Sequence, residues 1–276
     1  MDFQSYFPIW NKLTPAQQER ILGSLMERKI SKGTVIHNGS MDCTGLLLVK
    51  SGQLRAYILS DEGREITIYR LFDRDMCLFS ASCIMRSIQF EVTVETEKDT
   101  ELWIIPAEIY QSIMEESAPV SNYTNELMAT RFSDVMWLME QVMWKSLDKR
   151  VAAFLLGEMS IEGTDQLKIT HETIANHLGS HREVITRMLR YFQNEGMVKL
   201  SRGTIEITDT KKLEELNGYV SRCPPCVLHR RTSFIISDSL LDFSQLIECW
   251  HFAFLPYHTL PLRALQISWV MVPMGQ

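Results

Sequence analysis

The fold is decided by residues 169–194, which read ITHETIANHLGSHREVITRMLRYFQN. Thr170 precedes a short apolar repeat, and threonine is a common cap at the start of a helix. Gly179 then supplies a tight turn, and Ser180 is placed to cap a second helix over 181–194. Two short helices joined by a glycine turn are typical of a helix-turn-helix. The expected buried stripes are Ile174, Ala175 and Leu178, then Val184, Ile185, Met188, Leu189 and Phe192.

The second of these helices has a polar side that begins in its first turn, at Arg182 and Glu183. An arginine can donate two parallel hydrogen bonds to guanine, and a glutamate can accept one from cytosine. The pattern therefore predicts a helix that reads base edges in DNA. The alternative, that these arginines are merely solvated, leaves the capped helix pair and its turn unexplained. The residues expected to contact DNA from this segment are Thr170, Ser180, His181, Arg182, Glu183, Thr186, Arg187 and Arg190.

Residues 197–207 continue the same unit. Apolar and polar residues alternate on both sides of Ser201-Arg202-Gly203, which predicts two short strands around a turn. Such a hairpin after a recognition helix is a wing, and Lys199, Ser201 and Arg202 are placed to contact phosphates. Residues 149–217 are therefore expected to form a winged helix-turn-helix.

The front of the chain changes from helical spacing to a period of two. A proline after Thr14 predicts a first helix, with Ile21, Leu22, Leu25 and Met26 at helical spacing. From 33 to 105 the alternation predicts many short antiparallel strands, as in the jelly-roll group. The clearest example sets Leu54, Ala56 and Ile58 against Arg55 and Tyr57, and the expected turns are at 50–53, 61–63 and 97–100.

A long helix is predicted over residues 121–147, followed by a hinge at 148–150 and a polar loop at 157–165. Its apolar residues are spaced four and three apart, which is the seam of a coiled coil. Packing against its own barrel is the alternative, but Met136, Leu138 and Met143 widen the apolar surface beyond one small barrel. A parallel homodimer is favoured, with a seam of Met128, Phe132, Val135, Met139 and Val142.

The composition is that of a globular protein of two domains, and no apolar run approaches the length of a membrane span. The cysteines are too sparse for a disulfide scaffold, which favours free thiols. The chain does not start with a basic region followed by an apolar one, which favours a cytoplasmic location without membrane association. The net charge of −6 comes from residues 1–148, with 14 Lys+Arg against 21 Asp+Glu, whereas residues 149–220 hold 10 of each. A neutral segment can still present a basic face where its arginines cluster. No nucleophile–base pair, phosphate loop or metal spacing indicates an enzyme or a metal site.

Taken together, these motifs resemble the Crp/Fnr regulators, the family of the cyclic AMP receptor protein and the fumarate-nitrate regulator. The resemblance covers residues 5–217 and is most specific in Arg182-Glu183-x-x-x-Arg187. In the front half it depends on Gly33, Lys50-Ser51-Gly52 and Asp61-Glu62-Gly63-Arg64-Glu65. It implies an α+β fold: an N-terminal antiparallel β-roll that senses an effector, a dimerisation helix and a winged helix on a two-fold symmetric promoter site. By the family's pattern Arg182 and Glu183 each read a G·C pair of a TGTGA-like half-site, Arg187 reaches a neighbouring base or phosphate, and RNA polymerase is a further partner.

The effector is left open. Family members that bind cyclic nucleotides carry an Arg-Ser-Ala cassette, and alignment on residues 101–104 places Phe90 and Glu91 there, where a carboxylate repels a phosphate. Cyclic AMP is therefore not expected, although Arg86-Ser87 could serve if the loop were shorter. The cysteine cluster that holds an iron–sulfur centre near the N-terminus of some family members is lacking. A redox sensor based on thiols stays an alternative, and a haem bound at His37 has no support. The tentative pocket, suited to a weakly polar ligand or to packing alone, comprises Cys77, Leu78, Ser80, Ser82, Cys83, Arg86 and Phe90.

The last 56 residues do not follow the pattern. Only 7 of residues 221–276 are charged, prolines are frequent, and no helical or strand period is sustained. A shifted reading frame and low order are suspected, and Cys223-Pro-Pro-Cys226 lacks the second pair of a zinc site. The expected domains are 1–118, 119–148, 149–217 and 218–276. The function favoured is a dimeric transcription regulator without catalytic activity; the alternative is a small-molecule sensor whose helical domain contacts a protein.

Overall fold

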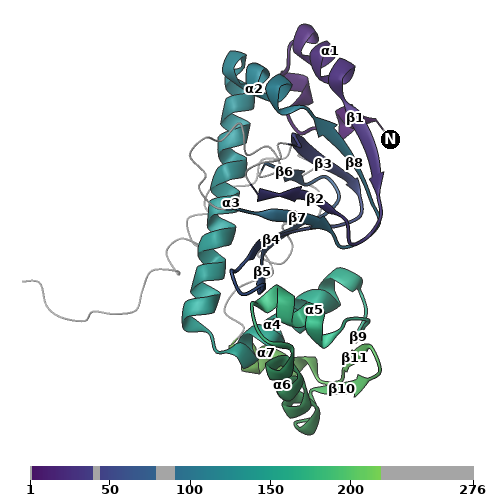
Figure 1. The fold of residues 1–276 in the computed structure, drawn as a ribbon, viewed down its shortest axis with the longest axis vertical. Coiled ribbons are helices and arrows are strands. Elements are labelled where there is room, and N and C mark those ends of the chain that lie inside the picture. The colour runs from purple at the N-terminus through teal and green to yellow at the C-terminus, as the bar shows by residue number, and fades with distance from the viewer. Residues whose placement is uncertain (1, 40–43, 79–90, 219–276) are drawn as a thin grey trace, which may run out of the picture. The chain divides into compact units, whose positions relative to one another are not determined.

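The computed structural model describes residues 2–39, 44–78 and 91–218 (Figure 1). The chain opens with two 3₁₀ turns, Phe3–Ser5 and Trp10–Lys12, and with helix α1 (Pro15–Ser24). Thr14 caps α1 as expected: its hydroxyl accepts from the Gln17 N–H, and the Gln17 side chain accepts from the Thr14 N–H. Ile21 is buried, but Leu22 is exposed, and Met26 begins a strand instead of ending the helix. The first strand thus starts earlier than the sequence indicated.

Two antiparallel sheets of four strands form the β-roll, which confirms the predicted fold class (Figure 1). One sheet has the order β1-β8-β3-β6 and the other β2-β7-β4-β5. Leu47 and Leu102 from the first sheet and Leu54 and Val94 from the second belong to one buried apolar cluster. The strands are β1 (Met26–Ile30), β2 (Val35–Asn38), β3 (Leu46–Ser51), β4 (Leu54–Leu59), β5 (Glu65–Leu71), β6 (Met76–Cys77), β7 (Thr93–Thr96) and β8 (Thr100–Ile105).

Strand β4 departs from the predicted alternation. Arg55 and Tyr57, which alternate with the apolar residues, are buried along with Leu54 and Ala56, whereas Ile58 is exposed. The reason is tertiary, because the outer side of β4 and β5 is covered by a later helix and does not face water. The turn at 61–63 is confirmed, with Gly63 at φ +76° and its N–H bonded to the Ser60 carbonyl.

Helix α2 (Ala107–Glu116) precedes α3 (Ala118–Trp144), the long helix of Figure 1. Only two residues separate the end of α3 from the start of helix α4 (Leu147–Glu162). The expected hinge at 148–150 therefore lies inside the first turn of α4, and the actual break is at Lys145 and Ser146. Residues 157–162, expected in a loop, are instead the last turns of α4, which has Gly163 as its C-cap; Glu158 is buried there.

The remaining elements form a three-helix unit with a small sheet. They are β9 (Gln166–Leu167), α5 (His171–Leu178), α6 (Arg182–Asn194), β10 (Val198–Ser201), β11 (Thr204–Ile207) and α7 (Thr210–Asn217). The predicted hairpin is present as β10–β11, and β9, which the sequence did not reveal, adds a third strand to β11. Val151, Leu155, Ile174, Leu189 and Phe192 share its apolar core. Among the described residues, no helix combines the length and apolar character that crossing a membrane would take. The predictions for 218–276 fall almost entirely outside the described residues.

Candidate nucleic-acid interface

Helix α5 begins and ends where the sequence indicates. The Thr170 hydroxyl accepts a hydrogen bond of 3.1 Å from the Thr173 N–H, which satisfies one of the unpaired donors of the first turn. Gly179 ends the helix at φ +64°, and a Cβ on it would lie 3.1 Å from Cδ1 of Ile66. A side chain at 179 would thus meet both an unfavourable backbone conformation and a packed neighbour.

Helix α6 begins one residue later than predicted. His181 occupies the N-cap position without a side-chain hydrogen bond, so Ser180 is not the cap, and the Ser180 N–H instead closes the turn on the Ala175 carbonyl at 3.0 Å. Ile185, Leu189 and Phe192 are buried, while Val184 and Met188 are only half-buried. Burial of this one stripe leaves the opposite side of the helix to solvent. The exposed residues on that side include His181, Arg182, Glu183, Arg187 and Arg190.

The N-terminal end of α6 is therefore accessible to solvent. The Arg182 side chain is 66% exposed, with its Nε 4.0 Å from the Glu172 carboxylate of α5. The half-buried Thr186 donates to the Arg182 carbonyl at 2.8 Å, and its oxygen lies 2.9 Å from Nδ1 of His171. Burial, together with Arg182 and Arg190, lowers the pKa of His171. His171 and Glu172 were missed by the sequence reasoning, since only the packing of α5 on α6 brings them to Arg182.

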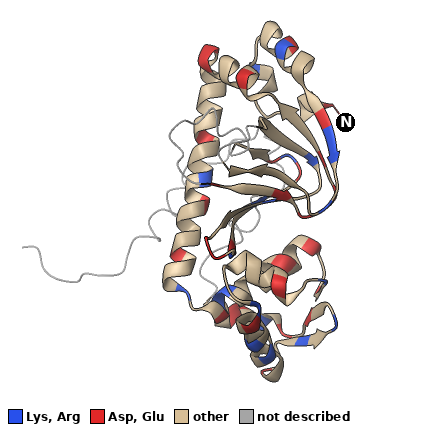
Figure 2. Ribbon diagram, viewed as in Figure 1, with Lys and Arg blue, Asp and Glu red and all other residues tan. Residues whose placement is uncertain are grey.

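The wing lies beside this end of α6. A groove of about 480 Å³ is lined by Thr170, His171 and Arg182 from the helix pair and by Ser201 and Gly203 from the hairpin. Lys199 and Arg202 are exposed, and Nζ of Lys199 lies 3.5 Å from the Glu206 carboxylate. In Figure 2, Lys and Arg positions are seen on α6 and on the hairpin. The expected phosphate-binding residues are thus on the same unit as the reading helix.

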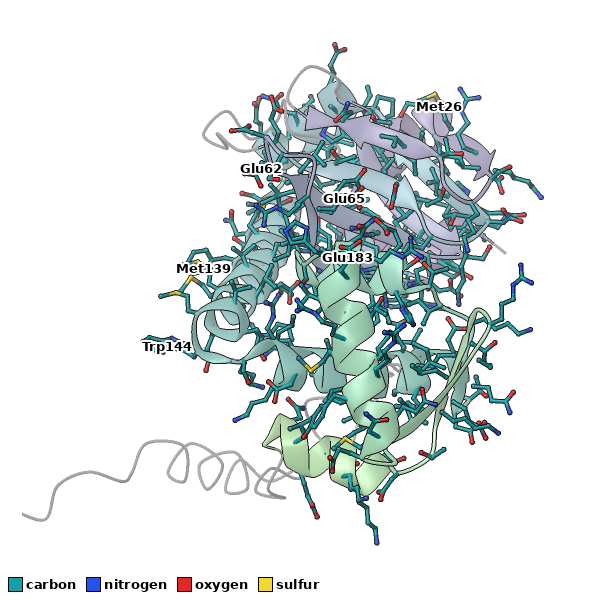
Figure 3. The ribbon with its side chains drawn as sticks, turned by 60° about the horizontal axis from the view of Figure 1, so that its bottom comes forward. Met26, Glu62, Glu65, Met139, Trp144 and Glu183 are labelled. Carbon is teal, nitrogen blue, oxygen red and sulfur yellow. The ribbon has the colours of Figure 1, made fainter. Side chains whose placement is uncertain are left out.

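The predicted dimerisation residues lie on α3. Phe132 is 67% exposed, Met139 and Val142 are also exposed, and Met128 and Val135 are half-buried. Apolar exposure extends beyond the seam to Met136, Met143, Trp137 and Trp144, and the side chains of Met139 and Trp144 project away from the ribbon (Figure 3). Several large exposed apolar residues on one helix are typical of an interaction surface.

The tentative effector pocket is described only in part. Cys77 and Leu78 are buried, while Ser80, Ser82, Cys83, Arg86 and Phe90 lie outside the described residues. The Cys77 Sγ is 3.9 Å from the hydroxyl of Tyr69, and the Arg131 guanidinium of α3 lies 4.4 Å from the centre of the Tyr69 ring. Burial raises the pKa of Tyr69 well above its usual value. The surroundings of Cys77 thus combine a thiol, a phenol and a cation from three elements.

Comparison with known proteins agrees with this architecture. Residues 27–117 match the cyclic nucleotide-binding domain model, and residues 149–216 match the Crp-like helix-turn-helix domain model. A cyclic AMP receptor protein of Thermus thermophilus is 26% identical over 211 residues, which cover 76% of this chain and 96% of the relative. An anaerobic regulatory protein of Aggregatibacter actinomycetemcomitans is 27% identical over 207 residues, covering 71% of this chain and 79% of the relative.

One solved structure is far more similar. It is a chain from Eubacterium rectale assigned to the crp/fnr family of transcriptional regulators, 78% identical, with a TM-score of 0.76. The similarity covers 78% of this chain and 99% of that one. With both domain models matched in the expected order, the chain belongs to the Crp/Fnr family.

Proposed function

We propose that the protein is a homodimeric transcription regulator that reads a palindromic promoter site and senses an effector other than cyclic AMP in its β-roll. The observation that carries the proposal is the exposed Arg182–Glu183 pair on the first turn of α6, a helix whose other side is buried. The first turns of a recognition helix are the part that reaches base edges in the major groove. Lys199 and Arg202 on the wing contribute phosphate contacts, which add affinity but little sequence information.

The apolar face of α3 supports the dimer. A helix of 27 residues is about 40 Å long, and its exposed apolar residues recur at coiled-coil spacing. Two copies joined along this face would carry two reading helices to half-sites about one turn of DNA apart. RNA polymerase is the expected partner at the promoter, and no catalytic step is assigned to the protein.

Fluorescence anisotropy with a labelled TGTGA-type palindrome tests the proposal. Arg182→Ala is expected to weaken binding by about 1–3 kcal/mol, the usual discrimination of one bidentate base contact. Arg64→Ala is the matched control, because Arg64 is an exposed arginine of the β-roll that pairs only with the neighbouring Glu62 in the described contacts. Unaltered binding by Arg182→Ala would refute DNA reading through α6 and favour the other candidate, a helical domain that contacts a protein.

A further inference from the structure

The outer side of the β4–β5 pair carries charged groups that are buried against α5. Arg55 and Arg70 are cross-strand partners, so their side chains share one face of the sheet. In a regular strand, Thr67 and Arg70 would lie on opposite faces. The register shift that pairs Ala56 with Tyr69 and Tyr57 with Thr67 skips one residue of β5. A bulge of this kind returns Thr67 and Arg70 to the same face.

Both of these side chains meet His177, near the end of α5. The Thr67 hydroxyl lies 2.7 Å from Nδ1 of His177, and Nη2 of Arg70 lies 2.8 Å from Nε2. Oε1 of Glu97, in the turn between β7 and β8, is 3.0 Å from the same Nε2. The imidazole is only 3% exposed. A histidine of the helix-turn-helix is therefore enclosed by groups of the β-roll.

Arg70 is the centre of this cluster. Its Nε lies 3.0 Å from the Glu97 carboxylate, and its Nη1 bonds to the carboxylate of Glu158 on α4. We call Arg70, Glu97, Glu158 and His177 the latch. Arg70 and Glu97 belong to the β-roll, Glu158 to α4 and His177 to α5, and the Arg70 side chain is 12% exposed. Charge-assisted hydrogen bonds fix direction as well as distance, in contrast to an apolar contact.

Further contacts from β4 and β5 hold the last turn of α5. Arg55 donates to the Asn176 carbonyl at 3.2 Å while it pairs with Glu65 and Glu95. The backbone of Ile66 forms an isolated antiparallel β-bridge with Leu178, the residue before the turn at Gly179. Because the Ser180 N–H closes that turn on α5, the direction of α6 follows from the placement of α5.

Strand β5 connects the latch to the residues around Cys77 in the β-roll. Tyr69 is adjacent to Arg70 on β5, and its ring is the one under Arg131 of α3 and beside Cys77. Buried ion pairs contribute little net stability because desolvation offsets their attraction, and geometric specificity is their better-attested use. We propose that Arg70 is a positioning residue for DNA recognition, which fixes α5, and through Gly179 the reading face of α6, to the sensor strand β5. This inference rests on the proposed DNA-binding function.

Full-length Arg70→Met tests the inference, because methionine keeps the length of the stem and removes the charge. In anisotropy titrations over several salt concentrations, operator affinity is expected to fall about tenfold or more, as preorganisation of the two reading helices is lost. Binding to a scrambled duplex is expected to stay within about twofold with an unchanged salt slope, because no phosphate contact is removed. Backbone amides of 171–179 are expected to exchange hydrogen faster.

Lys98→Met is the matched control. Lys98 and Glu162 also pair across the two domains, at 2.8 Å, but their side chains are 49% and 40% exposed, so little change is expected. Glu158→Gln is a milder second variant if Arg70→Met folds poorly, and a smaller loss in the same direction supports the inference. Operator binding that is unchanged or tighter in a folded latch variant overturns it. A wild type that binds no duplex refutes the proposed function, whereas a binding wild type with an unaffected Arg70→Met refutes only the role of Arg70.

Discussion

Acid is expected to destabilise the protein through His177. Burial lowers the pKa of this imidazole to about 4 from an ordinary value of 6.5, and Glu97 offsets only part of that shift. The unfolded chain therefore takes up a proton near pH 6.5 that the folded protein does not accept until about pH 4. The free energy of unfolding is flat above pH 7 for this group and falls as the pH drops through that window.

The magnitude follows from the two pKa values. A difference of about 2.5 units corresponds to about 3 kcal/mol once both states are protonated, and about 2 kcal/mol of it is lost between pH 7 and pH 5. Two carboxyls lie beside His177. Burial acts to raise the pKa of Glu97, but its hydrogen bonds to His177 and Gln53 and the charge of Arg70 lower it overall, whereas burial raises the pKa of Glu158. Arg55 and Arg70 also face the imidazole, and their positive charges disfavour its protonation.

Urea unfolding at pH 5, 6 and 7, followed by far-UV circular dichroism, measures the effect. His177→Asn is expected to lose about 2 kcal/mol less than the wild type between pH 7 and pH 5. His181→Asn, which alters an exposed histidine four residues away, is expected to keep the wild-type slope. Equal pH slopes for His177→Asn and the wild type would refute the argument, as would an NMR titration that places His177 near its ordinary pKa.

Three further changes test the fold and the assembly. Met139→Lys on the exposed face of α3 is expected to weaken dimerisation and operator affinity together, and a wild type that sediments as a monomer would contradict this. Gly179→Ala is expected to lower the free energy of unfolding by about 1–3 kcal/mol, because of its positive φ and the contact with Ile66; urea midpoints measure it, and Gly157→Ala, in open space, is the control. Thr170→Ala is expected to lower it by about 1 kcal/mol through loss of the α5 cap, and an unchanged midpoint would show that the cap is dispensable.

Local chemistry explains why much of the reading unit was predictable. Thr170, Gly179 and the stripe of Ile185, Leu189 and Phe192 act through contacts a few residues apart in the chain. The same reasoning located α6 but misjudged its cap by one residue, since a serine and a histidine next to each other both precede the first turn. It also misread 157–162 as part of a loop, because Gly157 and Ser160 inside α4 resemble turn residues by composition alone.

The β-roll shows where local patterns stop being informative. The alternation in β4 correctly indicated a strand, but it gave no sign that Arg55 is buried, and Arg55 is 5% exposed. No spacing rule links residue 70 to residue 158, or residue 97 to residue 177, and the bulge in β5 has no signal in its sequence.

The helix pair with its glycine turn and the polar residues at the start of α6 are evident in the amino-acid sequence, because each depends on neighbours within one or two turns of chain. Which polar residues are buried, the addition of β9 to the wing sheet and the meeting of Arg70 with His177 follow only from the folded chain. Those outcomes depend on docking of surfaces that are distant along the chain, where burial converts solvated charges into directed contacts.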